Sequence, residues 1–354
     1  MTAAASVLEV IGNTPSVWLD RMVAARGLRG RILAKLDYLN PGYSKKDRAA
    51  LGIIRAARAD GTLAPGQAVV ELTSGNMGTG LAIVCAQMGH PLVAVMSRGN
   101  SPERAAMMTA LGAEVVLVDQ APGSRPGEVS GTDLALVEEE ARRLTEARGA
   151  FRADQFNHPG NAAAHAATTG PELWRDSGGT LSAFADFAGS GGSYAGVMQA
   201  LTEENPAIRG YLIEPDGAAA LAGDPVTKPA HPIQGGGYAM QDLTLLQGHA
   251  PAGYLTVTGD EARSTARALA QGPDLECDGV IFDLEASVAP EAKDEARESL
   301  RQFFADGRAA SLPAGMERII RINSLSSPWG GEDLLAARGC RPDAILIPKV
   351  DAPD

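Results

Sequence analysis

Short apolar runs alternate along the chain with longer stretches in which apolar residues recur at helical spacing. Three of the runs, AVVEL (68–72), LVAVM (92–96) and EVVLVD (114–119), are apolar almost throughout, and each is followed by a helix-like stretch. Strands that are apolar on both faces are typical of a parallel sheet with helices on both sides. The pattern therefore predicts an α/β fold built on parallel sheets.

Glycine-rich turns follow several of the predicted strands. They are TSGNMGTG (Thr73 to Gly80), GSGGSYAG (Gly189 to Gly196) and IQGGGYA (Ile233 to Ala239). Glycine lets backbone N–H groups approach an anion, and a following helix adds its positive N-terminal dipole. GSGGS before a helical stretch is thus a candidate phosphate site, with Ser193 adding a hydroxyl donor. A ligand-free strand-to-helix connection would give the same local pattern.

A dinucleotide site is the competing interpretation of this segment. Gly189 and Gly191 follow a strand, and Glu214 ends the next strand about 20 residues later, as such a site requires. The third glycine of that fingerprint would fall at Tyr194, where close helix–strand packing needs a small residue. The segment therefore favours a phosphate site over a nicotinamide cofactor.

Two adjacent lysines, Lys45 and Lys46, stand in the stretch NPGYSKKDRAA, where a turn leads into a helix. Two solvated cations at a helix start would explain them. A lysine used for covalent chemistry must instead be deprotonated by burial or by a neighbouring cation. A phosphate site combined with such a lysine is the pattern expected for pyridoxal 5'-phosphate.

Six motifs together resemble the cysteine synthase family of pyridoxal-phosphate enzymes, in the family's order over about residues 5–270. They are IGNTPSVWL, AKLDYLNPGYSKKDRAA, TSGNMGTG, QFNHPGNAAAHAATTGPELW, GSGGS and IEP. The resemblance implies the two-domain parallel-sheet α/β fold of the tryptophan synthase β-like enzymes, over residues 1–271. It also implies a small domain at about 45–155 inserted in the larger one, a homodimer, and β-replacement or β-elimination on a small β-substituted amino acid such as O-acetylserine.

The resemblance also implies which residues bind the cofactor. Lys46, the lysine before Asp47, would carry pyridoxal 5'-phosphate as a Schiff base and move the α-proton of the substrate. Asn76 would bind the ring hydroxyl. The phosphate would lie against Gly189, Ser190, Gly191, Gly192 and Ser193.

The substrate carboxylate would be held by two segments. Thr73, Ser74, Gly75 and the residue at Met77 belong to a loop that closes on substrate, and Gln155 lies on the second segment. Met77 stands where cysteine synthases commonly carry threonine. The missing threonine hydroxyl removes a donor for the substrate carboxylate, so this departure argues against O-acetylserine as the substrate.

The sequence pattern changes near residue 272. The segments CDGVIFDLEASVAPEAKDEAR, ERIIRINSLSSPWGGEDL and DAILIPKVDAP resemble the start of the citrate lyase β-subunit-like family, whose members are CoA-ester lyases with a TIM barrel. Ala286 stands where that family usually carries aspartate, and Arg321 matches an arginine associated with acyl-CoA.

Residues 272–354 are accordingly predicted to be a partial βα fragment of a TIM barrel, fused to a cysteine synthase-like module that it leaves impaired. The carboxylates that bind magnesium in the barrel family belong to later strands that the sequence lacks. A magnesium-dependent CoA-ester lyase and a non-catalytic relic are the alternative functions.

The composition limits the kinds of partner that are expected for this protein. The 354 residues carry a net charge of −12, from 43 carboxylates and 31 basic residues, which argues against nucleic acid or an anionic membrane surface. No run of eighteen apolar residues and no basic-then-apolar leader is present, so no membrane span and no secretion signal are expected. Cys85, Cys277 and Cys340 match no metal or redox spacing, which favours a cytoplasmic protein. The five scattered histidines argue against a metal site.

Overall fold

The computed structural model describes most of the chain and divides it into two compact units. The described residues are 3–73, 75–124, 129, 131–229, 231–233, 235–271, 279–285, 288, 290–311 and 317–348. The first unit comprises Met1–Trp18 and Leu33–Ser264, and the second comprises Leu19–Ile32 and Thr265–Asp354. Ser74, Cys277 and Ala286 lie outside the described residues.

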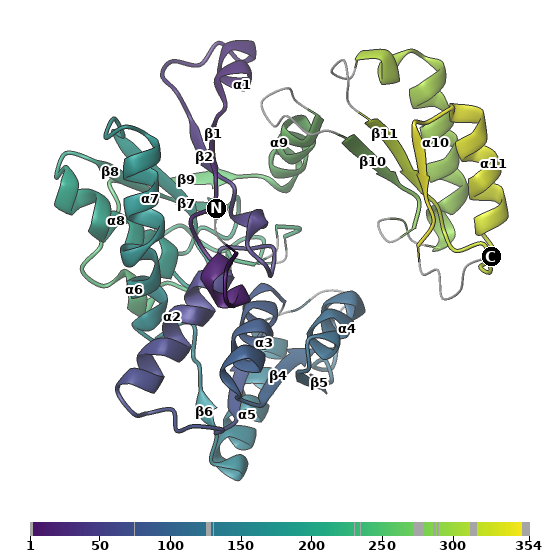
Figure 1. Ribbon diagram of the computed structural model, residues 1–354. Coiled ribbons are helices and arrows are strands. Elements are labelled where there is room, and N and C mark those ends of the chain that lie inside the picture. Colours follow the sequence, from purple (N-terminus) through teal and green to yellow (C-terminus); the bar gives the residue numbers. More distant parts are fainter. Residues whose placement is uncertain are drawn as a thin grey trace. The chain divides into compact units, whose positions relative to one another are not determined.

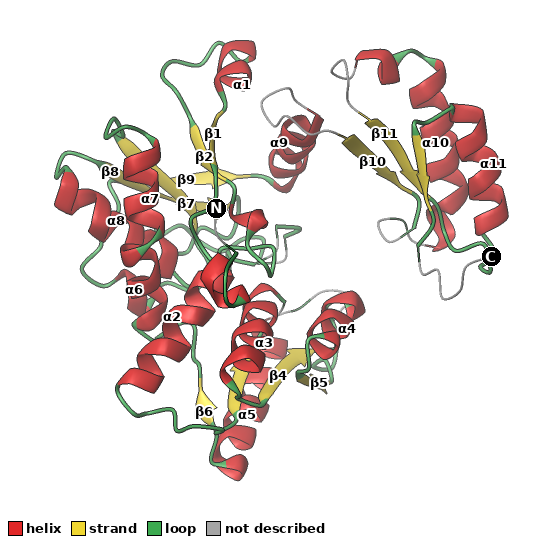
Figure 2. Ribbon diagram, in the orientation of Figure 1, coloured by secondary structure: helices red, strands yellow, loops and turns green. Residues whose placement is uncertain are grey.

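One parallel sheet of the first unit has the strand order β5-β4-β3-β6 (Figures 1 and 2). The strands are β3 (Val69–Leu72), β4 (Leu92–Ser97), β5 (Glu114–Val118) and β6 (Phe151–Arg152). The helices of this part are α2 (Lys46–Ala59), α3 (Asn76–Met88), α4 (Pro102–Ala110) and α5 (Gly131–Arg148). The three apolar runs are therefore strands of one parallel sheet, as their composition predicted.

A second parallel sheet has the order β7-β8-β9. Its strands are β7 (Ala183–Phe187), β8 (Arg209–Pro215) and β9 (Gly253–Val257). Helices α6 (Gly160–Ala167), α7 (Thr169–Asp176) and α8 (Gly192–Glu204) belong to the same unit, whereas α9 (Gly259–Gln271), which follows β9, begins in this unit and ends in the second. Strands β1 (Ser16–Trp18) and β2 (Leu33–Lys35) form an antiparallel pair, and the short helices η1 (Val7–Val10), η2 (Asp37–Leu39) and η3 (Thr244–Leu246) complete this unit.

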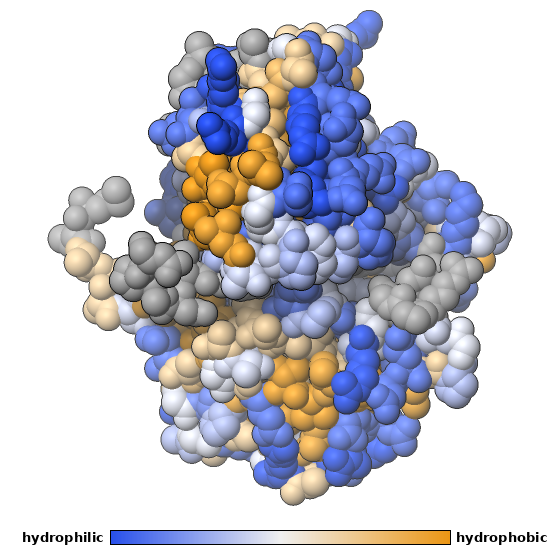
Figure 3. All heavy atoms as spheres, turned by 90° about the vertical axis from the view of Figure 1, so that its right-hand side faces the viewer, coloured by the Kyte–Doolittle hydropathy of each residue, from blue (hydrophilic) through white to orange (hydrophobic). Residues whose placement is uncertain are grey.

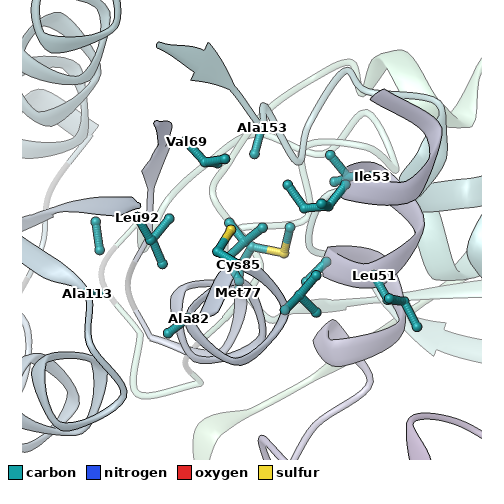
Figure 4. Packing of buried hydrophobic residues seen from close by; sticks show 14 of the residues in the cluster. Leu51, Ile53, Val69, Met77, Ala82, Cys85, Leu92, Ala113 and Ala153 are labelled. Carbon is teal, nitrogen blue, oxygen red and sulfur yellow. The ribbon is translucent and has the colours of Figure 1, made fainter. Parts of the chain in front are cut away.

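Strand β3 shows why these runs are apolar. Val69 is fully buried in a cluster that also contains Ile53 of α2 and Met77 and Cys85 of α3 (Figure 4). The next residue, Val70, is fully buried in a different cluster, formed with side chains of α5. Because successive side chains of a strand point to opposite faces, the sheet is covered on both sides.

Three helices of the first unit approach closely because glycines lie where they meet. Helix α6 contacts both α2 and α8 (Figure 1). A methyl group at Gly52 of α2 would lie 2.5 Å from the Gly160 carbonyl oxygen, and one at Gly196 of α8 would lie 2.8 Å from the backbone nitrogen of Ala166. Both positions therefore require glycine for the observed spacing.

The second unit contains a third parallel sheet, ordered β10-β11-β12. The elements are β10 (Gly279–Asp283), β11 (Glu317–Arg321), β12 (Ala344–Leu346), α1 (Asp20–Ala25), α10 (Lys293–Ala305), α11 (Gly330–Cys340), η4 (Pro290–Ala292) and η5 (Arg308–Ser311). Leu300, Ile320 and Ala337 belong to its core. Ile281 and Ile345 remain exposed, and Figure 3 shows hydrophobic surface gathered in patches on one face of the molecule.

Asp133 lies in the first turn of α5 and accepts hydrogen bonds from the Ala121 N–H at 2.7 Å and the Ser124 hydroxyl at 2.9 Å. This carboxylate therefore ties Ala121 and Ser124 to the helix. Among the described residues, none of the helices is both long and apolar enough to cross a membrane.

Replacing Gly196 with alanine is expected to lower the free energy of unfolding by about 1 to 3 kcal/mol, because the added methyl group overpacks the α6–α8 contact. Urea unfolding would measure the change. Gly131→Ala is the matched control, since Gly131 is also helical and a methyl group there meets nothing within 4 Å. Equal effects of the two substitutions would contradict the packing argument.

Candidate functional site

The turn before α2 is wrapped around a buried carboxylate. Asp47 is fully buried, and one of its oxygens accepts the Gly42 N–H at 2.5 Å. Any side chain at Gly42 would collide with this carboxylate. Burial raises the pKa of Asp47 to about 6, with the Gly42 N–H opposing the shift. Asp47 therefore fixes the turn that delivers the two lysines.

Arg48 anchors the same turn to two other elements. Its guanidinium donates to both oxygens of Glu172 on α7, at 2.6 and 2.8 Å, and to Asp37 at 2.8 Å. The side chains of Arg48 and Glu172 are almost completely buried. The ion pairs of Arg48 with Asp37 and Glu172 therefore hold the turn against η2 and α7.

Lys46 is the first residue of α2, and its amine lies 3.4 Å from the hydroxyl of Ser190. Its pKa is lowered to about 8, mainly because burial disfavours the charged form and also because Lys45 repels it. The carboxylates of Asp186 and Glu71 oppose this shift. A lysine amine with this pKa is substantially neutral in mildly alkaline solution, as a nucleophile or base requires.

The loop that contains Ser190 joins β7 to α8. Gly191 is the N-cap of α8 and has a φ of 82°, which only glycine adopts easily. The first backbone N–H groups of the helix, from Gly192 onward, have no partner within the helix. A methyl group at Gly189 would lie 2.9 Å from the Gly235 carbonyl oxygen, so the loop is closely packed. The geometry is that of an anion site at a helix N-terminus.

Ser193 lies in the first turn of α8, and its hydroxyl donates a very short hydrogen bond to Asp186 at the end of β7. The amine of Lys45 contacts both residues, at 2.6 Å from the Asp186 carboxylate and 2.9 Å from the Ser193 hydroxyl. Lys45 is therefore not a freely solvated cation. Asp186 was not predicted as a site residue, because it is a single polar residue in an otherwise apolar strand.

The TSGNMGTG loop ends at the N-terminus of α3. Thr73 is buried, and its hydroxyl oxygen accepts the N–H groups of Gly75 at 3.1 Å and Gly78 at 2.9 Å. Gly75 is the N-cap of α3, and Asn76, the first residue of the helix, is exposed. The Thr73 hydroxyl thus organises the start of α3 and keeps its own proton for another acceptor.

Met77 differs from its neighbours in the loop, because its side chain is buried in the hydrophobic cluster with Cys85 (Figure 4). Any contact of this residue with a ligand would come from its backbone.

Gln155 and Asn161 connect the two loops. The Gln155 side-chain amide donates to the Leu72 carbonyl at 3.4 Å, directly before Thr73. Asn161, on α6, donates to the Gln155 carbonyl at 2.7 Å and to the Ser190 hydroxyl at 3.0 Å. Asn161 lies in the QFNHPGN motif but was not predicted as a site residue.

The dinucleotide interpretation does not fit this geometry. Both oxygens of Glu214 accept backbone N–H groups, from Leu221 at 3.1 Å and Ala222 at 3.0 Å, so the carboxylate is occupied within its own loop. Tyr194 is buried in the core rather than leaving room for close helix–strand approach. In the part of the chain that the structure describes, no group of three or more acidic, His or Cys side chains could hold a metal ion.

The site combines a lysine amine of lowered pKa with an anion site on the adjacent loop. An aldehyde that also carries a phosphate matches both features, because the aldehyde reacts with the amine while the phosphate lies at the helix N-terminus. The residues present therefore fit pyridoxal 5'-phosphate.

Comparison with known proteins gives the same family. The family model for pyridoxal-phosphate dependent enzymes matches residues 7–307. Cysteine synthase 3 of Caenorhabditis elegans is 39% identical over 267 residues, which cover 74% of this chain and 74% of that protein. The cysteine synthase of Staphylococcus aureus is 39% identical over 242 residues, covering 68% of this chain and 73% of that protein.

Solved structures also match. O-acetyl serine sulfhydrylase isoform 3 from Entamoeba histolytica has a TM-score of 0.70 at 28% identity and covers 90% of this chain and 88% of that one. O-ureido-L-serine synthase has a TM-score of 0.67 at 31% identity, with 96% of each chain covered.

Glu71 is a further buried carboxylate near the site, on β3. It is completely buried, and Arg152 lies 3.6 Å away. Burial raises its pKa from 4.5 to about 7, with Arg152 opposing the shift. A carboxylate with a raised folded-state pKa favours the folded state below pH 4.5, and this contribution is lost as the pH rises through about 7.

Glu71→Gln is therefore expected to leave the free energy of unfolding nearly unchanged at pH 5 and to raise it by roughly 1 to 3 kcal/mol at pH 8. Urea unfolding at both pH values would measure this. Glu138→Gln is the matched control, because Glu138 also pairs with Arg152 at 2.8 Å but its side chain is 56% exposed. A gain that is the same at both pH values would show that the charge of Glu71 is not the cause.

Proposed function

Because this chain belongs to the pyridoxal-phosphate dependent enzyme family, we propose that it catalyses β-replacement on a small β-substituted amino acid, with O-acetylserine as the first candidate. The observation that carries this proposal is the Lys46 amine 3.4 Å from Ser190 in the anion-binding loop. The similarity to cysteine synthases supports the reaction class. Because Met77 is buried in the core, assays that compare O-acetylserine with other O-substituted serines would identify the substituent.

The cofactor would be held at three points. Lys46 would bind its aldehyde carbon, the backbone N–H groups of the Gly189–Ser193 loop would bind its phosphate, and Asn76 would bind its ring hydroxyl. The exposure of Asn76 next to the start of α3 supports this role, because its amide is available to a ligand. When bound, pyridoxal 5'-phosphate supplies an electron sink that stabilises negative charge at the substrate Cα.

Lys46 would also move the proton at Cα. Its lowered pKa would supply a neutral amine that can accept the proton at the substrate Cα. The same amine, now protonated, can return the proton to the product. Asn161 would hold Ser190, and with it the loop, in position beside the amine of Lys46.

The substrate carboxylate would bind at the N-terminus of α3. The Thr73 hydroxyl, the N–H groups of the Ser74–Met77 loop and the Gln155 amide are the candidate donors. The positive end of the α3 dipole favours an anion at this place. These groups would orient the Cα–H bond toward Lys46.

We also propose a small domain at about 45–155 within a module of residues 1–271, and the separate sheet of β3 to β6 supports it. Exposed apolar side chains at Val10, Leu39 and Tyr43 support a homodimer, which sedimentation velocity would test. A cytoplasmic location agrees with the buried free thiols of Cys85 and Cys340.

Residues 272–354 are proposed to be a βα fragment that resembles the CoA-ester lyases and takes no part in the chemistry. Three parallel strands with helices α10 and α11 support the likeness. Arg321, the residue matched to an acyl-CoA contact, pairs with Asp283 at 2.6 and 2.8 Å. Magnesium-dependent cleavage of an acyl-CoA by the purified chain would overturn this assignment.

Lys46 is expected to be the residue that carries the cofactor. Borohydride reduction of the purified chain with pyridoxal 5'-phosphate, followed by peptide mapping, should give a pyridoxyl label on Lys46. Lys46→Ala should lose the label and the release of acetate from O-acetylserine. A label on Lys45, or bound cofactor without any label, would contradict the proposal.

A further inference from the structure

The two adjacent lysines contact opposite ends of the same loop. Lys46 lies near Ser190, whereas the Lys45 amine is 2.9 Å from the hydroxyl of Ser193 and 2.6 Å from the carboxylate of Asp186. Three elements supply this second group, because Lys45 is the N-cap of α2, Asp186 is in β7 and Ser193 is in the first turn of α8.

The hydrogen bonds of this group limit what Ser193 can do. A serine hydroxyl has one proton, and that of Ser193 is directed at Asp186. In this arrangement the proton is not available to a phosphate. The Lys45 ammonium has three N–H bonds, of which two are accounted for by Asp186 and Ser193, and its side chain is 35% exposed.

Asp186 places a negative charge beside the proposed anion site. Its carboxylate is bonded to the first turn of α8, where the loop would receive a phosphate, and its side chain is only 15% exposed. A carboxylate at this place repels the phosphate unless a cation compensates it. Lys45 is the cation that contacts it.

We propose that Lys45 binds the phosphate of the cofactor directly and that Asp186 is the carboxylate that positions Lys45 and Ser193 beside the loop. This inference rests on the proposed function, since the phosphate is that of pyridoxal 5'-phosphate. Lys45 would thus supply the side-chain contact to the phosphate that the sequence pattern had assigned to the Ser193 hydroxyl.

A purely structural role for the pair makes a different prediction. If Lys45 and Asp186 only tie α2 to β7, removing either residue loosens the same link and weakens phosphate binding in the same direction. If Lys45 binds the phosphate, the two substitutions act with opposite sign. Loss of the cation weakens binding, whereas Asp186→Asn removes the repelling charge and keeps a side-chain oxygen that can still accept from Lys45 and Ser193.

The experiment uses the full chain freed of cofactor and measures dissociation constants for inorganic phosphate, pyridoxal 5'-phosphate and pyridoxal. Pyridoxal lacks the phosphate, so the ratio of the two aldehyde affinities cancels any effect of Lys45 on the amine of Lys46. Phosphorus NMR follows the inorganic phosphate, and visible absorption follows the two aldehydes. The variants are Lys45→Met and Asp186→Asn, with Lys45→Arg as the charge-preserving control and circular dichroism to confirm folding.

Lys45→Met should weaken binding of inorganic phosphate and of pyridoxal 5'-phosphate by about 10- to 100-fold, with little change for pyridoxal. Asp186→Asn should tighten phosphate binding, and Lys45→Arg should stay close to the parent chain. Equal losses for both aldehydes, or weaker phosphate binding in both Lys45→Met and Asp186→Asn, would overturn the inference. Failure of the parent chain to bind pyridoxal 5'-phosphate would instead overturn the proposed function.

Discussion

A buried guanidinium holds the start of α2 in place, and the candidate site depends on it. Arg48 donates to both oxygens of Glu172 on α7 and to Asp37. Leaving one member of such a group buried without its partner typically costs about 3 to 5 kcal/mol. The three side chains therefore fix one another, and the helix start cannot shift without breaking them. Lys46 is two residues before Arg48, so the same contacts fix its position.

The opposite side of the site is set by backbone spacing rather than by charge. Gly52 and Gly196 allow α6 to approach both α2 and α8, so the helices that carry Lys46 and Ser193 are held through a common neighbour. Asn161, near the start of α6, then reaches the Ser190 hydroxyl. The distance between the amine and the phosphate loop is thus a consequence of two glycines and one amide, none of which carries out chemistry.

Much of this arrangement was predictable because it is encoded in local patterns. Apolar strands gave the parallel sheets, glycine turns gave the loops, and collinear motifs gave the family. The sequence did not predict Asp186 or Asn161 as site residues, since a single polar residue in a strand or a helix has no local signature. It also did not predict Glu172 as the partner of Arg48, because the two residues are 124 positions apart and only the tertiary fold brings them close.

The two lysines illustrate how neighbouring residues of one type come to differ chemically. Burial lowers the pKa of Lys46, and the positive charge of Lys45 adds to that effect. Asp186 works in the opposite direction, because it contacts Lys45 and also stabilises the charged form of Lys46. Exchanging either member of the Lys45–Asp186 pair therefore alters the amine as well as the loop. The charges of this pair therefore couple the phosphate loop to the amine of Lys46.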